Sequence, residues 1–306
     1  MRLRYLHLAG SLAALALIPV LIAHLDRDAL SQALSEVSLV DIGIGLLIVQ
    51  IQIVVSALRW RFTARRLGQD MPTRWAIREY YIATALNQVL PGGVAGDVLR
   101  AYRSRASAPS GLRLAAKSVI IERLSGQMAF FAVCAAGLFF WPMLLASVFS
   151  TGVLPFALIV LVAACLALGL AWNRLAPLRA DLNQVFVRNG AWRIQAGLSL
   201  SAVASYILLF YFAAFATGGT LPVSALVTIV PLCLLSMLIP TGFGGWGTRE
   251  AAAAALWPLV GLASAQGVAA SVVYGALALL GSLPGLLLLF VRNREAVRDA
   301  HGESRA

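Results

Sequence analysis

The chain has 306 residues, of which 60% are hydrophobic and 12% are charged, whereas soluble proteins are roughly 25% charged. This composition, with a mean hydropathy of +0.84, excludes a soluble globular domain and indicates a protein that lies within a lipid bilayer. The net charge of +11 does not indicate nucleic acid as a partner, because the basic residues are confined to short groups between apolar segments.

Six segments are apolar and long enough to cross a bilayer as helices. In chain order they are 5–23, 40–58, 118–141, 154–172, 194–217 and 267–290. The first follows Arg2 and Arg4 as a secretory signal would, but no small-x-small cleavage site follows it, so we expect it to be a retained span.

Twenty-one of the 24 Lys and Arg residues fall into five groups, at 2–4, 59–78, 100–117, 174–193 and 292–305. The positive-inside rule places these groups in the cytoplasm. We therefore expect a multi-pass protein of the cell inner membrane with both termini cytoplasmic.

Two further apolar segments are each interrupted by a run of Pro and Gly. Residues 75–102 lie between two basic groups, so this segment would enter and leave the membrane on the cytoplasmic side. Such re-entrant backbone is tolerated where protein or a watery cavity satisfies its polar groups. The segment 221–257 would do the same from the opposite side. The alternative topology counts each hairpin arm as a full span. It would place the first two internal basic groups on opposite sides of the membrane unless two very short arms both crossed.

The two interruptions resemble each other in sequence. "LPGGVAGDVLR" at 90–100 and "IPTGFGGWGTR" at 239–249 share Pro, Gly, Gly and Arg at one offset, 240 − 91 = 149. The same offset carries 5–23 onto 154–172 and 118–141 onto 267–290. We therefore predict an all-α bundle of two inverted repeats, 1–149 and 150–306, each with three full spans and one re-entrant hairpin.

Arg123 and Arg249 lie outside the basic groups, in apolar surroundings. An Arg at bilayer depth costs at least roughly 2.5–3.5 kcal/mol, so it needs a partner. Adjacent helical residues point about 100° apart, so we expect pairing across helices, for example of Glu122 with Arg249 or of Glu250 with Arg123.

Two interpretations of these charges remain open. They are either buried ion pairs that fix the packing of the halves, or part of a site in which Arg100 and Arg249 bind a phosphate-bearing headgroup through paired hydrogen bonds. The glycine-rich turns would add free backbone N–H groups. Trp246, within the second turn, would line a lipid path or fill space.

Four peptides resemble the transmembrane domain of the lysylphosphatidylglycerol synthase/flippase family, also called the multiple peptide resistance factor family. They are "ALRWR" (57–61), "NQVLPGGVAGDVLRAY" (87–102), "ERLSG" (122–126) and "PTGFGGWGTREAA" (240–252). The resemblance implies a lipid-translocating domain whose broken helices enclose the headgroup. It implies site residues at Asn87, Pro91, Gly93, Gly96, Asp97, Arg100, Glu122, Arg123, Gly242, Gly245, Arg249 and Glu250.

The leading hypothesis is a flippase that moves an anionic phospholipid or a polyprenyl-phosphate-linked lipid between leaflets. The alternative is an integral-membrane lipid transferase, or an accessory subunit of one, with Asp97, Glu122 or Glu250 as base. We find no catalytic motif, no metal-ligand spacing and no cofactor motif. We expect a stand-alone membrane domain without the soluble synthase domain of the full-length family members. The expected partner is a membrane lipid with a phosphate headgroup; a second copy of the chain and a lipid-synthesis enzyme are the protein partners left open.

Overall fold

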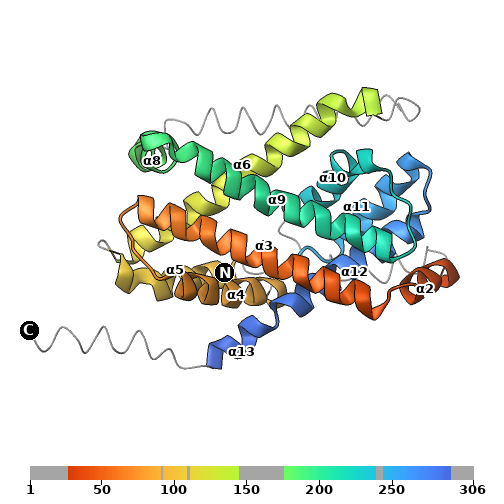
Figure 1. The fold of residues 1–306 in the computed structure, drawn as a ribbon, viewed down its shortest axis with the longest axis horizontal. Coiled ribbons are helices and arrows are strands. Elements are labelled where there is room, and N and C mark those ends of the chain that lie inside the picture. The colour runs from red at the N-terminus through yellow and green to blue at the C-terminus, as the bar shows by residue number, and fades with distance from the viewer. Residues whose placement is uncertain (1–26, 91, 109–110, 145–175, 239–243, 291–306) are drawn as a thin grey trace, which may run out of the picture.

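The computed structural model describes residues 27–90, 92–108, 111–144, 176–238 and 244–290 (Figure 1). Within these ranges every regular element is a helix and no strand occurs, which confirms the predicted all-α class. The α-helices are α2 (Arg27–Ser35), α3 (Leu39–Arg66), α4 (Thr73–Val89), α5 (Ala95–Arg103), α6 (Leu112–Leu144), α8 (Ala176–Leu182), α9 (Ala191–Ala216), α10 (Ile229–Leu235), α11 (Thr248–Leu256), α12 (Ser264–Ser282) and α13 (Pro284–Phe290). Short 3₁₀ and π turns connect them, at η1 (Ser104–Ser107), η3 (Asn183–Val187), η4 (Arg188–Gly190), η5 (Val223–Leu226), η6 (Ser236–Leu238) and η7 (Trp257–Val260).

In the described part of the chain, four helical segments are long and apolar enough to cross a membrane. They lie in α3, in α6, in the run from α8 through α9 (Arg179–Ala216) and in the run from α12 into α13. These helices and runs contain the predicted spans 40–58, 118–141, 194–217 and 267–290 except for residue 217. The predicted spans 5–23 and 154–172 lie outside the described residues. Pro284 begins α13 directly after α12, as expected for a residue that cannot continue the preceding hydrogen-bond ladder.

Helix α3 shows how the sequence sets these elements. The hydroxyl of Ser38 accepts a hydrogen bond from the Asp41 N–H at 3.2 Å, and the Asp41 carboxylate accepts one from the Ser38 N–H at 3.0 Å. This reciprocal cap fixes where the helix begins. From there to its basic end the exposed face is apolar, with Leu47 60% exposed and Ile51 52% exposed, as a lipid-facing surface requires.

Helices α3 and α9 lie side by side and run in opposite directions (Figure 1). At one end, Arg66 of α3 donates to the carbonyl oxygens of Gln184 and Arg188, just before α9. At the other end, Glu36, just before α3, lies against Gly218, just after α9. The two helices that the offset of 149 makes equivalent are thus antiparallel neighbours.

Helices α4 and α5 form a hairpin that begins and ends on one side of the bundle. The side-chain amide of Gln69, before α4, donates to the Ser104 carbonyl oxygen, after α5, at 2.8 Å. The arms pack closely because Gly96 has no side chain, and a Cβ there would lie 2.0 Å from the Ala83 carbonyl oxygen.

Helices α10 and α11 form the second hairpin. It follows the end of α9, and the Tyr211 hydroxyl there donates to the Leu221 carbonyl oxygen at 3.0 Å. Because the first hairpin follows α3 and the second follows the antiparallel α9, the two hairpins enter the bundle from opposite ends.

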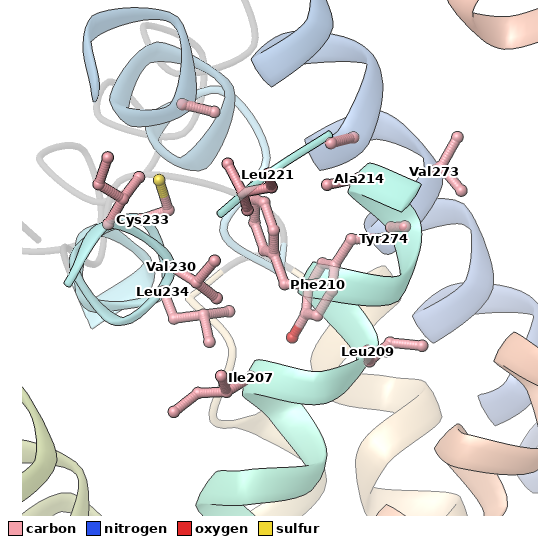
Figure 2. Close-up of a cluster of buried hydrophobic side chains, with 14 of the residues drawn as sticks. Ile207, Leu209, Phe210, Ala214, Leu221, Val230, Cys233, Leu234, Val273 and Tyr274 are labelled. Carbon is pink, nitrogen blue, oxygen red and sulfur yellow. The ribbon is translucent and has the colours of Figure 1, made fainter. Parts of the chain in front are cut away.

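The largest cluster of buried apolar side chains joins α9 to α10, α11 and α12 (Figure 2). Phe210 of α9 lies at its centre, with ring centroids 5.1 Å from Tyr274 and 5.8 Å from Trp257. Val230 and Leu234 of α10 complete it. This packing holds the second hairpin in place and so positions its glycine-rich turn.

Candidate functional site

A cavity of about 330 Å³ lies between the turns of the two hairpins. The first hairpin contributes Asn87, Gln88, Gly92 and Gly93 to its lining, and the second contributes Met237, Leu238, Gly244 and Gly245. The walls come from α3, α6, α9 and α12. The sequence predicted a site at this place, where the two broken segments meet.

Two glycines and the hydrogen bonds of Asn87 set the shape of the turn of the first hairpin. Gly92 and Gly93 have φ values of +84° and +60°, which favour glycine. The Asn87 side chain accepts a hydrogen bond from the Gly96 N–H at 2.8 Å and donates to Asp97 at 3.0 Å. Asn87 thereby caps α5 from the opposite arm and orients the Asp97 carboxylate.

A buried ion cluster centred on Glu122 of α6 lies beside the cavity. Arg59 donates to one oxygen of this carboxylate through Nε at 3.0 Å and Nη2 at 2.5 Å, and Arg100 donates to the other oxygen at 3.0 Å. The Glu122 and Arg100 side chains are 0% exposed and Arg59 is 8% exposed. Each of these charges is stable at this depth because it is paired.

Arg100 lies behind the cavity wall. Its guanidinium is 4.5 Å from the ring centroids of both Trp60 and Tyr80, and it donates to Asp97 at 2.8 Å. Stacking of this kind is favourable for a desolvated cation. The Nε and Nη1 groups of Arg100 have no hydrogen-bond partner among the described residues.

Arg123 lines the cavity, as Arg59 does, but its side chain is 40% exposed, whereas that of Arg59 is 8% exposed and that of Arg100 is 0% exposed. It forms an ion pair with Asp97 and donates to the Gly93 carbonyl oxygen at 3.0 Å. The predicted pairing of Arg123 with Glu250 is therefore wrong: Arg123 pairs within its own half.

The predicted pairing of Arg249 with Glu122 is also wrong. Arg249 donates to the adjacent Glu250 at 2.7 Å and to the Ser271 hydroxyl at 2.8 Å. The adjacent pair forms because Glu250 folds back to accept the Gly247 N–H at the start of α11, which turns its other oxygen toward Arg249. The Arg249 guanidinium also lies over the rings of Trp246 (5.1 Å) and Tyr274 (4.8 Å).

Arg100 and Arg249 make contacts at positions that the sequence offset relates to each other. Arg100 contacts Glu122, and the offset of 149 carries these residues onto Arg249 and Ser271, which also contact each other. The equivalent glycines of α6 and α12 each leave room for a guanidinium: a Cβ at Gly126 would lie 2.7 Å from Arg59, and one at Gly275 would lie 2.4 Å from Arg249.

The structure thus sorts the predicted site residues into three sets. Asn87, Gly93, Asp97, Glu122, Arg123 and Gly245 line the cavity. Gly96, Arg100, Trp246, Arg249 and Glu250 do not line it. Pro91 and Gly242 lie outside the described residues.

The sequence analysis missed Arg59, which it assigned to a cytoplasmic basic group. The structure places Arg59 inside the bundle, because Gln52, Ser56, Arg59 and Thr63 follow helical spacing on one buried face of α3. That polar stripe, in an otherwise apolar segment, is the signal that could have found it. Gln52, Tyr80 and Tyr206 line the same side of the cavity.

The family model for the lysylphosphatidylglycerol synthase transmembrane region matches residues 7–285. A search of curated proteins found no match. The family match covers both hairpins and all four described membrane-length segments up to residue 285, and it agrees with the resemblance carried by the two glycine-rich motifs. The chain belongs to the lysylphosphatidylglycerol synthase transmembrane-region family.

Proposed function

We propose that this protein moves an anionic, phosphate-bearing lipid between the leaflets of the membrane. The observation that carries the proposal is the cavity lined by both hairpin turns, since a site at the junction of two broken segments is typical of transporters that alternate access between the two sides. The headgroup would occupy this cavity and the acyl chains would remain in the bilayer.

The charge around the cavity supports an anionic substrate. Arg59, Arg100 and Arg123 contact Asp97 and Glu122, which gives this cluster a formal charge of 3 − 2 = +1. An excess positive charge in surroundings of low dielectric constant is stabilised by an anion. A headgroup phosphate would supply it. Arg59 and Arg123 both line the cavity, and Arg123 is the more exposed of the two.

The inverted-repeat organisation is part of the proposal. The antiparallel packing of α3 and α9, the entry of the hairpins from opposite ends and the equivalent arginine contacts all support it. The proposal also includes two re-entrant hairpins, both termini in the cytoplasm and a repeat boundary near residue 149, since these belong to the same arrangement.

The test is a leaflet-exchange assay with purified protein in sealed vesicles and no ATP. Arg123→Gln should slow the exchange of fluorescent phosphatidylglycerol by about tenfold or more, because a charge-assisted hydrogen bond contributes about 1.5–3 kcal/mol. Arg113→Gln is the matched control, since it removes the same charge from an exposed position at the start of α6. Exchange at the wild-type rate in the folded Arg123→Gln variant would refute the proposal.

Mass spectrometry of the same vesicles tests the enzymatic alternative. If the protein converts phosphatidylglycerol to a new covalent species without exchanging it between leaflets, the transferase function replaces transport. We expect the recovered lipid to be chemically unchanged.

A further inference from the structure

A second site lies at the basic end of α3, away from the cavity. Here Arg61, Arg65 and Arg66 line a groove whose apolar residues are Leu58 and Phe62 of α3 and Leu198 of α9. The five α3 residues have spacings of three and four, so they share one face of the helix. The groove therefore combines three guanidinium groups with an apolar wall.

The positive charge of this groove is largely uncompensated. Arg61 is held by the Met71 carbonyl oxygen at 2.9 Å, and Arg66 by the carbonyl oxygens of Gln184 and Arg188 at 2.7–2.9 Å. These partners are neutral, so they orient the guanidinium groups without cancelling their charge. Arg65 lies 3.8 Å from Asp70, whose side chain is 87% exposed, and such an exposed pair is weak.

The residues around the groove are those expected at the headgroup level of a membrane. Trp192, 57% exposed at the start of the neighbouring α9, is of the residue type that collects at membrane interfaces. Along α3, the apolar face continues from Leu58 toward the other side of the membrane through Ile51 and Leu47. The distance from Arg61 to Ile51 is about 15 Å of helix, which is one leaflet of a hydrocarbon core of about 30 Å.

We propose that this groove binds an anionic phospholipid of the basic-side leaflet as a resident lipid, separate from the transported one. Its phosphate would lie between Arg61 and Arg65, which are one helical turn apart, and an acyl chain would lie along Leu58 and Ile51. Guanidinium groups suit this ligand because they donate paired hydrogen bonds to phosphate oxygens. The distinction between a resident and a transported lipid rests on the proposed function of the cavity.

Native mass spectrometry of the full chain, titrated with phosphatidylglycerol in detergent, tests this site. Arg61→Gln/Arg65→Gln should weaken one binding event by about 30-fold, whereas the control Arg105→Gln/Arg113→Gln, which removes two arginines elsewhere on the same basic side, should leave binding unchanged. The single variant Arg65→Gln should weaken this binding event by about fivefold. Because the Arg65 side chain is 57% exposed, this single variant should fold, and it therefore controls for misfolding of the double variant. Phosphatidylcholine and inorganic phosphate should not occupy the groove.

The cavity variant separates the two proposals. Arg123→Gln should remove a different binding event and leave the groove lipid in place. If Arg123→Gln has no effect while Arg61→Gln/Arg65→Gln loses a lipid, the transport site is wrong and the groove stands. Unchanged phosphatidylglycerol binding in the folded Arg61→Gln/Arg65→Gln variant, or equal binding of phosphatidylcholine, would overturn the groove.

Discussion

Replacement of Glu122 by Gln tests whether the buried ion cluster stabilises the bundle. Each oxygen of this carboxylate accepts from an arginine, Arg59 on one side and Arg100 on the other. Gln retains the shape but loses the charge, and its NH₂ group would face a guanidinium. Arg100 keeps its hydrogen bond to Asp97, but the described hydrogen bonds of Arg59 both go to Glu122, so the loss falls mainly on Arg59.

Removal of one partner from a buried pair costs about 3–5 kcal/mol, chiefly because the remaining charge is left unpaired. We expect this loss in the free energy of unfolding for Glu122→Gln. Adding Arg59→Met should recover part of it, with a coupling of at least about 1 kcal/mol between the two sites, because the double variant leaves no orphan charge at Arg59. The control Glu36→Gln makes the same chemical change at an exposed position and should stay within about 0.5 kcal/mol of the wild type.

The assay is equilibrium unfolding in mixed detergent micelles, followed by circular dichroism, for the wild type, both single variants and the double variant. A Glu122→Gln protein within about 1 kcal/mol of the wild type would contradict the reasoning. So would strictly additive effects of Glu122→Gln and Arg59→Met, because additivity would mean that the two side chains do not stabilise each other.

Three further outcomes are expected. Gly96→Ala should destabilise the protein by about 1–3 kcal/mol in thermal unfolding, because its Cβ would lie 2.0 Å from a backbone oxygen of α4, whereas Gly43→Ala, with nothing within 4 Å, should be tolerated. Arg249→Met should lower the free energy of unfolding by about 3–5 kcal/mol. It should reduce lipid exchange only in proportion to the folded fraction, since this arginine does not line the cavity. A variant that is folded but inactive would contradict a purely structural role for Arg249. In intact cells, an impermeant thiol reagent should label a cysteine introduced at Asp28 but not one at Ser107, and labelling at Ser107 would make the first hairpin a full crossing.

The sequence was sufficient to predict the helical class, four described membrane segments and the place of the cavity. Hydropathy identifies a span from its own residues, and the duplicated Pro and Gly pattern locates two broken segments that can be matched to each other. Gly93 and Gly96 illustrate this: their type already indicates a turn and a close helix contact, and the structure contains both.

The partners of the buried charges could not be predicted in the same way, because they depend on rotation of the helices and on side-chain reach. Arg249 pairs with its neighbour Glu250 only because the carboxylate folds back to a backbone N–H at the start of α11. Arg59 lies next to the basic end of α3 in sequence, and only the buried polar face of that helix distinguishes it from the exposed Arg65. Arg100, which one of the two open interpretations assigned to headgroup binding, lies over the rings of Trp60 and Tyr80 and does not line the cavity.

The excess positive charge beside the cavity also bears on how well the membrane holds its ion gradients. A cavity between two hairpins that is lined in part by polar side chains is a place where protons and metal cations could leak across the bilayer. A net charge of 3 − 2 = +1 beside this cavity would repel them, as fixed positive groups do in pores that exclude protons. The same arginines that favour an anionic headgroup would thus keep the lipid pathway insulating, and a pH-sensitive dye inside protein-containing vesicles would reveal a leak if they did not.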